Sequence, residues 1–146
     1  MSTEANKQVV RRYFSEVLDG KRIDVMPELI RHDAVLHRPG FDVVGLDAAM
    51  KRLAATLAEF TAFSSEVSGI VAEGDMVCVR IHHRTRVRAH TFRSRAGELE
   101  VRAEQPLDWT AIVQFRLVDG RIAEEWVNRD ELGMLLQLGH VALAPR

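Results

Sequence analysis

The sequence predicts an α+β fold in which N-terminal helices cover one face of a curved antiparallel sheet. Apolar residues recur with a helical period up to about position 60, and the period changes to two after Phe63. Turn signals then separate consecutive strands. Helices that precede a run of hairpins are typical of the α+β class. A curved sheet under three helices encloses a cone, and such a hollow is a natural ligand site.

Length and composition limit the possible classes of protein. The chain of 146 residues predicts one domain spanning residues 1–146. A hydrophobic fraction of 47% and a charged fraction of 28% are ordinary for a globular protein. The net charge of −1 argues against bulk attraction to nucleic acid or membrane. Without an apolar signal segment or a run approaching about 18 apolar residues, we expect a cytoplasmic protein.

The helices are indicated by their apolar stripes. Residues 3–20 carry such a stripe and end at Asp19-Gly20. Residues 23–32 predict a short second helix, because Asp24 can cap it and proline is tolerated in a first turn. Residues 34–45 break the helical pattern and predict a short strand and a loop. Residues 46–60 again carry a buried stripe and predict a third helix.

The strands follow as three hairpins. Residues 64–92 predict two strands joined by Glu73-Gly74-Asp75, and a second hairpin is centred on residues 94–98. Residues 106–128 predict a third pair, turned at Asp119-Gly120. Asn128, with Glu131 three residues later, resembles a capping box and predicts the start of a final helix.

A basic row within residues 80–90 raises the question of nucleic-acid binding. Six basic side chains share one strand face by the period of two: Arg80, His82, Arg84, Arg86, Arg88 and His90. A turn at Arg95-Ala96-Gly97 would set Ser94 opposite Glu98 and Arg88 opposite Glu104. No aromatic residues interleave the row, so we expect a salt-bridged surface or dimer surface and no nucleic-acid partner.

The histidines do not form a recognisable metal motif. His82 and His90 lie about 26 Å apart along a strand at ~3.3 Å per residue, too far to share an ion. A two-histidine site from His37 and His83 stays open. No phosphate loop, dinucleotide fingerprint or nucleophile motif is present in the sequence. The sequence therefore contains no metal or cofactor motif apart from that possible pair of histidines.

His83 differs from its neighbours because it belongs to the apolar set of its strand. Its parity is that of Val77, Val79, Ile81 and Val87. A histidine on an apolar face is either a satisfied core residue or, where the core is hollow, a functional group. Both interpretations of His83 stay open on the sequence alone.

The C-terminal stretch "VDGRIAEEWVNRDELGMLLQLG" resembles the SnoaL-like polyketide cyclases of the nuclear transport factor 2-like superfamily. The N-terminal segments "NKQVVRRYFSEVLDGKRIDVMPELIRHDAVLHRPG" and "GLDAAMKRLAATLAEF" and the hairpin "VAEGDMVCVRIHHR" are similar as well. The resemblance covers nearly the whole chain. It implies a conical α+β barrel, a dimer formed through the sheet, a mostly apolar pocket, and no organic cofactor or metal.

The resemblance does not extend to the cyclase residues. The aldol cyclases use an aspartate on the last strand and a histidine on the neighbouring strand, and the matching positions here hold Val127 and Val113. If Val127 faces inward, so do Ala123 and Glu125, whereas Ile122, Glu124 and Trp126 face the other way. Glu125 is then the ionisable group of this inner face. It is either a desolvated acid/base group with a raised pKa or a solvated carboxylate paired with an arginine.

Three functions are compatible with these features. The first is a cofactor-free acid/base enzyme acting on a small apolar or aromatic molecule, with Glu125, His83 and His37 as candidate catalytic residues. Its pocket would be lined by Tyr13, Phe14, Phe41, Trp109, Val113, Phe115 and Val127. The second is an epoxide-hydrolase-like variant, although its Asp-Arg-Asp set cannot be assembled from inward positions. The third is a non-catalytic ligand-binding or structural dimer. Whichever function holds, we expect a homodimer built on the sheet, with Trp126 in or beside the subunit contact.

Overall fold

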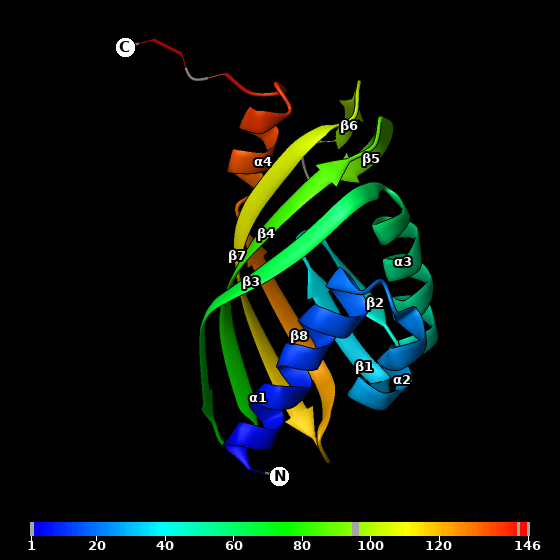
Figure 1. Ribbon diagram of the computed structural model, residues 1–146, viewed down its shortest axis with the longest axis vertical. Helices are drawn as coiled ribbons and strands as arrows, with labels where there is room; N and C mark the ends of the chain where they lie inside the picture. Colours follow the sequence, from blue (N-terminus) through cyan, green and yellow to red (C-terminus); the bar gives the residue numbers. More distant parts are fainter. Residues whose placement is uncertain (1, 95–96, 143, 146) are drawn as a thin grey trace.

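The computed structural model describes residues 2–94, 97–142 and 144–145. Six strands form one sheet in the order β2-β1-β8-β7-β4-β3, and β5 and β6 form a separate two-stranded sheet (Figure 1). The elements are α1 (Thr3–Arg12), the π-helix η1 (Tyr13–Asp19), the 3₁₀-helix η2 (Ile23–Val25), α2 (Met26–Leu29), β1 (Ile30–Arg38), β2 (Phe41–Val44), α3 (Leu46–Ala58), β3 (Phe60–Glu73), β4 (Met76–Val87), β5 (His90–Ser94), β6 (Gly97–Val101), β7 (Gln105–Val118), β8 (Arg121–Arg129) and α4 (Glu131–Gln137).

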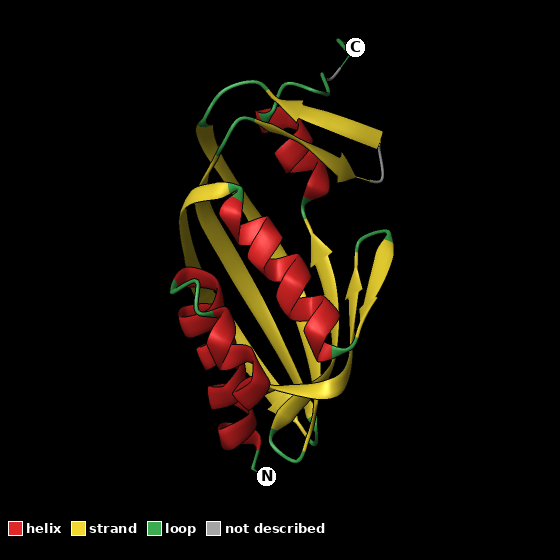
Figure 2. Cartoon of the chain, turned by 90° about the vertical axis from the view of Figure 1, so that its right-hand side faces the viewer, coloured by secondary structure: helices red, strands yellow, loops and turns green. Residues whose placement is uncertain are grey.

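The predicted fold class is confirmed. The sheet is curved, and the N-terminal helices and α3 lie on one side of it (Figure 2). Neighbouring strands are antiparallel except for β1 and β8, which run parallel. Strand β1 comes from the N-terminal half of the chain and pairs with β8 on the side that β7 leaves open. The hairpins β3–β4 and β7–β8 turn at the predicted glycine positions.

The first helix brings its aromatic residues against the sheet. Ser2 caps α1 by accepting a hydrogen bond from the Ala5 backbone N–H at 3.1 Å. The helix then continues as the wider π-helix η1, in which the consecutive residues Tyr13 and Phe14 are both buried. π-Helical segments are rare in proteins, and those that occur are often found at functional sites. Here η1 places two adjacent rings on the concave face of the sheet.

Three local predictions were wrong. Residues 30–32 belong to strand β1 and not to the second helix, which ends at Leu29. Asp130 caps α4 by accepting from the Gly133 N–H at 2.9 Å, while the expected cap Asn128 is still part of β8. Ile122 is buried in the core, because the register of β7 and β8 shifts between Arg116 and Leu117 and breaks the alternation there.

The basic row is divided between two sheets. Strand β4 ends at Val87, and β5 starts at His90 in the smaller sheet. The predicted register is off by one residue, since Ser94 lies opposite Gly97 and not opposite Glu98; Arg95 and Ala96 of the predicted turn lie outside the described residues. Arg84 of the basic row forms an ion pair of 2.6 Å with Glu66 on the neighbouring strand β3. This acidic partner comes from outside the hairpin that was expected to supply the partners of the row.

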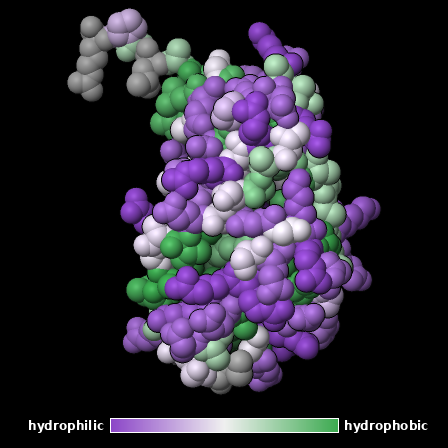
Figure 3. Space-filling model, viewed as in Figure 1, coloured by the Kyte–Doolittle hydropathy of each residue, from purple (hydrophilic) through white to green (hydrophobic). Residues whose placement is uncertain are grey.

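The outer surface is mixed in character. Figure 3 shows one face that is largely hydrophilic, with apolar side chains in separate patches. Across the described ranges, none of the helices combines the length and the apolar character needed to cross a membrane.

Candidate functional site

A cavity of about 380 Å³ lies between the concave face of the sheet and the helices. Its volume falls within the usual range for small-molecule sites, roughly 300–1,000 Å³. Six of the seven residues expected to line it do so: Tyr13, Phe14, Phe41, Trp109, Val113 and Val127. The seventh, Phe115, is completely buried beneath the cavity floor, where its ring packs edge-on against Tyr13 and Phe14.

Glu125 faces inward and forms an ion pair with an arginine. It lies opposite Phe115 on β7, and its side chain is 3% exposed. Arg38, at the end of β1, donates from Nη1 to Glu125 Oε1 at 3.2 Å and places Nη2 3.1 Å from Oε2. The same Nη2 donates to the Tyr13 hydroxyl at 3.4 Å. Glu125, Arg38 and Tyr13 therefore form one connected polar group in the cavity wall.

The electrostatics of this group follow from its burial. Loss of hydration raises the pKa of Glu125 above the usual value for a glutamate, and the positive charge of Arg38 opposes that shift. Burial and the nearby Glu125 charge raise the pKa of Tyr13 to about 12, so its hydroxyl stays protonated near neutral pH. A carboxylate that is desolvated, yet held beside a cation, can accept a proton without first losing a water shell.

His83 lies in an aromatic part of the same cavity. It is 6% exposed, and its ring lies 5.1 Å from Trp109 and 5.2 Å from Phe63 between centroids. A hydrogen bond of 2.9 Å joins its Nδ1 to the Ser65 hydroxyl. Burial, reinforced by the positive charges of His82, Arg129 and Arg38, lowers the pKa of His83 to about 4. The imidazole is therefore neutral at pH 7.

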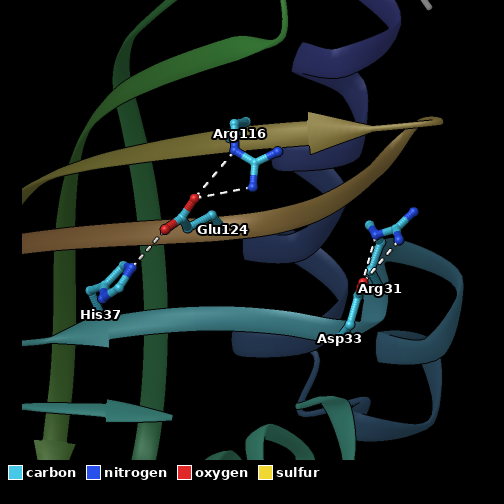
Figure 4. Close-up of polar contacts among 5 residues, drawn as sticks. All are labelled: Arg31, Asp33, His37, Arg116 and Glu124. Atoms are coloured by element: carbon cyan, nitrogen blue, oxygen red, sulfur yellow. Dashed lines mark hydrogen bonds and ion pairs between the residues drawn. The ribbon is translucent and has the colours of Figure 1, made fainter. Parts of the chain in front are cut away.

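His37 does not reach the cavity. Strand alternation on β1 turns Leu36 and Arg38 inward, so the ring of His37 lies on the opposite side of the sheet. There it stacks on Trp126 at 5.4 Å and bonds to Glu124 at 2.9 Å, while Arg116 holds the other side of that carboxylate (Figure 4). A shared histidine site from His37 and His83 is excluded by this placement.

Sequence reasoning missed Arg38, the ion-pair partner of Glu125. The sequence predicts a short strand and a loop within residues 34–45 but does not say where the strand ends. Strand β1 in fact continues to Arg38. The available signal was parity, since Ala34 and Leu36 are buried and Arg38 is the next residue of that set.

No metal centre is evident in the described parts of the chain. Residues 2–94, 97–142 and 144–145 contain no group of three or more histidine, cysteine, aspartate or glutamate side chains placed to hold an ion. The acidic residues that line the cavity are Glu59 and Glu125, and no aspartate is among the described lining residues. The Asp-Arg-Asp set of an epoxide-hydrolase-like site is accordingly not assembled here.

The chain belongs to the SnoaL-like polyketide cyclase family, whose model matches residues 8–138. Among solved structures, TsrD from Streptomyces laurentii is similar with a TM-score of 0.81 and 17% identity, covering 97% of this chain and 99% of that one. IdmH from Streptomyces antibioticus has a TM-score of 0.73 and 26% identity, covering 92% and 98%. An LEH-like epoxide hydrolase from M. tuberculosis has a TM-score of 0.74 and 17% identity, covering 93% and 90%. No curated protein gave a significant match.

Neighbours at 17% identity establish the fold alone, and the chemistry must come from the site. Val113 and Val127 lie opposite each other in register on β7 and β8, and both line the cavity. The two positions at which the resemblance places a histidine and an aspartate thus form an apolar wall. The buried carboxylate is one inward-facing position earlier on β8, at Glu125.

Proposed function

We propose that this protein is an enzyme that transfers protons on a small apolar, cyclic or polyketide-like molecule, with Glu125 as the acid/base group. The single observation that carries the proposal is the buried ion pair of Glu125 with Arg38 in the wall of a cavity that also presents aromatic and aliphatic side chains. Cyclisation, isomerisation and hydration all begin or end with such a transfer. These reactions require only groups that the chain itself supplies, so we propose that it acts without metal or organic cofactor.

The chemistry assigns one role to each polar residue. The Glu125 carboxylate accepts a proton from the carbon next to a substrate carbonyl, and the electrons of the broken C–H bond move to the carbonyl oxygen. Arg38 stabilises the resulting enolate, because its guanidinium still has N–H groups to donate while it holds Glu125. The protonated Glu125 then returns its proton to carbon, which isomerises the substrate, or to the oxygen of a second carbonyl that the enolate has attacked, which closes a ring.

We propose that neutral His83 orients the substrate or relays a proton, and that it does not abstract the first proton. Its pKa of about 4 makes it a weak base, whereas its hydrogen bond to Ser65 holds the ring in place. Trp109 and Phe14 beside it offer flat apolar surfaces for a cyclic substrate.

A non-catalytic binding function is the second candidate. It is favoured by the low exposure of the Glu125 side chain, 3%, and by its ion pair with Arg38, both of which suit a structural role. The same cavity would then hold a small apolar molecule without changing it.

Proton exchange with solvent separates the two candidates without knowledge of the product. Cyclic and aromatic ketones are first screened by thermal shift, and each hit is then incubated with protein in D₂O and followed by NMR for loss of the α-proton signal. We expect Glu125→Gln to slow this exchange by roughly 10²–10⁴-fold, the usual contribution of a general acid/base group. Glu124→Gln is the matched control, because its side chain lies on the other face of the same strand. Binding of a ketone without exchange in wild type would support the non-catalytic candidate instead.

We also propose a homodimer formed through the outer face of the sheet. Trp126 lies on that face beside His37 and opposite Gln114 of β7. Ile112, two residues before Gln114 on the same strand, is 48% exposed. Aromatic and aliphatic side chains surrounded by charge are typical of a two-fold contact.

A further inference from the structure

A second group of charged residues lines the cavity away from Glu125. Arg129, at the end of β8, has the same parity as Glu125 and Val127 and lines the cavity with them. Arg52 of α3 lines the cavity from the helical side, and its guanidinium lies 4.0 Å above the ring of Phe41. The two arginines therefore approach the same space from the sheet and from the helix layer.

Arg129 is only partly satisfied in its position. Its Nη2 lies 3.3 Å from Glu131 Oε1, but its Nε is buried and has no hydrogen-bond partner among the described residues. Burial lowers the pKa of Arg129, Glu131 opposes the shift, and the charges of Arg38 and Arg52 lower the pKa further. The positive charges of Arg38 and Arg52 thus act on Arg129, and an anion beside Arg129 would relieve that repulsion.

The balance of charge around the cavity points the same way. Its described lining holds three arginines, Arg38, Arg52 and Arg129, but only two glutamates, Glu59 and Glu125. Glu125 is paired with Arg38, and Glu59 lies 3.1 Å from His90. No carboxylate partner is recorded for Arg52 in the described part of the chain, where its contact is the Phe41 ring. Glu131 pairs with Arg129, so Arg52 is the guanidinium at this end without a carboxylate partner in the described part of the chain, and the buried Nε of Arg129 is free to donate.

We propose that the ligand of this cavity is an apolar acid whose carboxylate lies between Arg129 and Arg52. This assignment rests on the proposed function, because the reacting carbonyl of the same molecule would lie at Arg38 and Glu125. Guanidinium groups match the two oxygens of a carboxylate with paired N–H donors. The stacking of Arg52 on Phe41 limits its freedom before binding, so less entropy is lost when the acid arrives.

A matched pair of probes tests the carboxylate. Anthraquinone-2-carboxylic acid and anthraquinone-2-carboxamide share one ring system and differ in charge, and their dissociation constants are measured by calorimetry at pH 7. We expect the acid to bind wild type roughly 10-fold or more tightly than the amide. Arg129→Gln and Arg52→Gln should each remove most of that preference and leave the affinity for the amide unchanged. Arg129→Lys, which keeps the charge, should retain part of it.

Control variants identify the source of any effect. Arg22→Gln removes the same charge from a distant surface pair with Asp24, and it should bind both probes as wild type does. Equal affinities of acid and amide for wild type, or a preference lost only in Arg38→Gln, would overturn the assignment.

Failure of the proposed function has a different signature. Glu125→Gln should abolish proton exchange while the acid still binds at least as tightly as to wild type, because a negative charge has been removed from the cavity. Undiminished exchange in Glu125→Gln would refute the catalytic role and leave the carboxylate site standing.

Discussion

Replacing Arg38 with glutamine should leave a buried carboxylate without its counter-ion. The Glu125 side chain is 3% exposed, and Arg38 supplies both of its close cationic contacts, at 3.2 and 3.1 Å. Removing one partner of a buried ion pair typically costs about 3–5 kcal/mol. Because the Arg38 side chain keeps 22% of its surface exposed, we expect the lower end, about 3 kcal/mol at pH 7.

A double-mutant cycle measures the pair directly. Wild type, Arg38→Gln, Glu125→Gln and the double variant are unfolded in urea at pH 7, and their free energies of unfolding are compared. The double variant should recover about 2 kcal/mol relative to the sum of the single changes, since neither charge is then left alone. Costs that simply add, within about 0.5 kcal/mol, would refute the ion pair.

The pH dependence of the Arg38→Gln defect provides an internal check. Without Arg38, the folded-state pKa of Glu125 rises further above its unfolded value. The penalty therefore exists at pH values above that raised folded pKa. It disappears as the pH falls towards the unfolded value of about 4.3, because Glu125 is then protonated in both states. The free energies of unfolding of wild type and Arg38→Gln should converge at acid pH.

Two further predictions concern the other groups singled out above. Because the folded-state pKa of His83 is about 4 and that of an unfolded histidine is about 6.5, the unfolded chain binds an extra proton between these values, so stability should fall by about 3 kcal/mol from pH 6.5 to pH 4. The free energy of unfolding in urea, measured against pH, should lose this decrease in His83→Gln and keep it in the variant of an exposed histidine, His32→Gln. The same pH dependence in wild type and both variants would contradict the assigned burial of His83. Trp126→Asp should convert the proposed dimer to a monomer in light scattering at micromolar concentration, whereas a wild-type monomer under those conditions would exclude the dimer.

The inward face of the long strands could be predicted from sequence because the period of two is unbroken there. Val77, Val79, Ile81 and His83 are all buried on β4, as the alternation requires. The same rule placed Glu125 correctly on β8. It failed for Ile122, only three residues earlier, because the register shift near Arg116 inserts an extra residue into β8. Such a bulge leaves no clear signature in a single sequence.

The site itself could be predicted only in part, since it depends on contacts between distant segments. Glu125 and Arg38 are 87 residues apart in sequence and meet because β1 pairs in parallel with β8. A parallel contact between a strand near the N-terminus and the last strand is not signalled by any turn. The sequence allowed an arginine as the partner of Glu125, but without the parallel pairing of β1 and β8 nothing identified that arginine as Arg38.

The position of the carboxylate constrains what chemistry this cavity can perform. The resemblance to the aldol cyclases places their aspartate at Val127, whereas the carboxylate here is at Glu125, two residues or about 6.6 Å earlier along the strand at ~3.3 Å per residue. Val113 and Val127 face each other across β7 and β8 and offer no proton acceptor. With Glu125 as the proposed base, a substrate would present its reacting carbon beside Tyr13 and Arg38, with its apolar body against the valine pair. A molecule oriented for the cyclase positions would find only side chains that cannot accept its proton, so the proposed function requires a different orientation of the substrate.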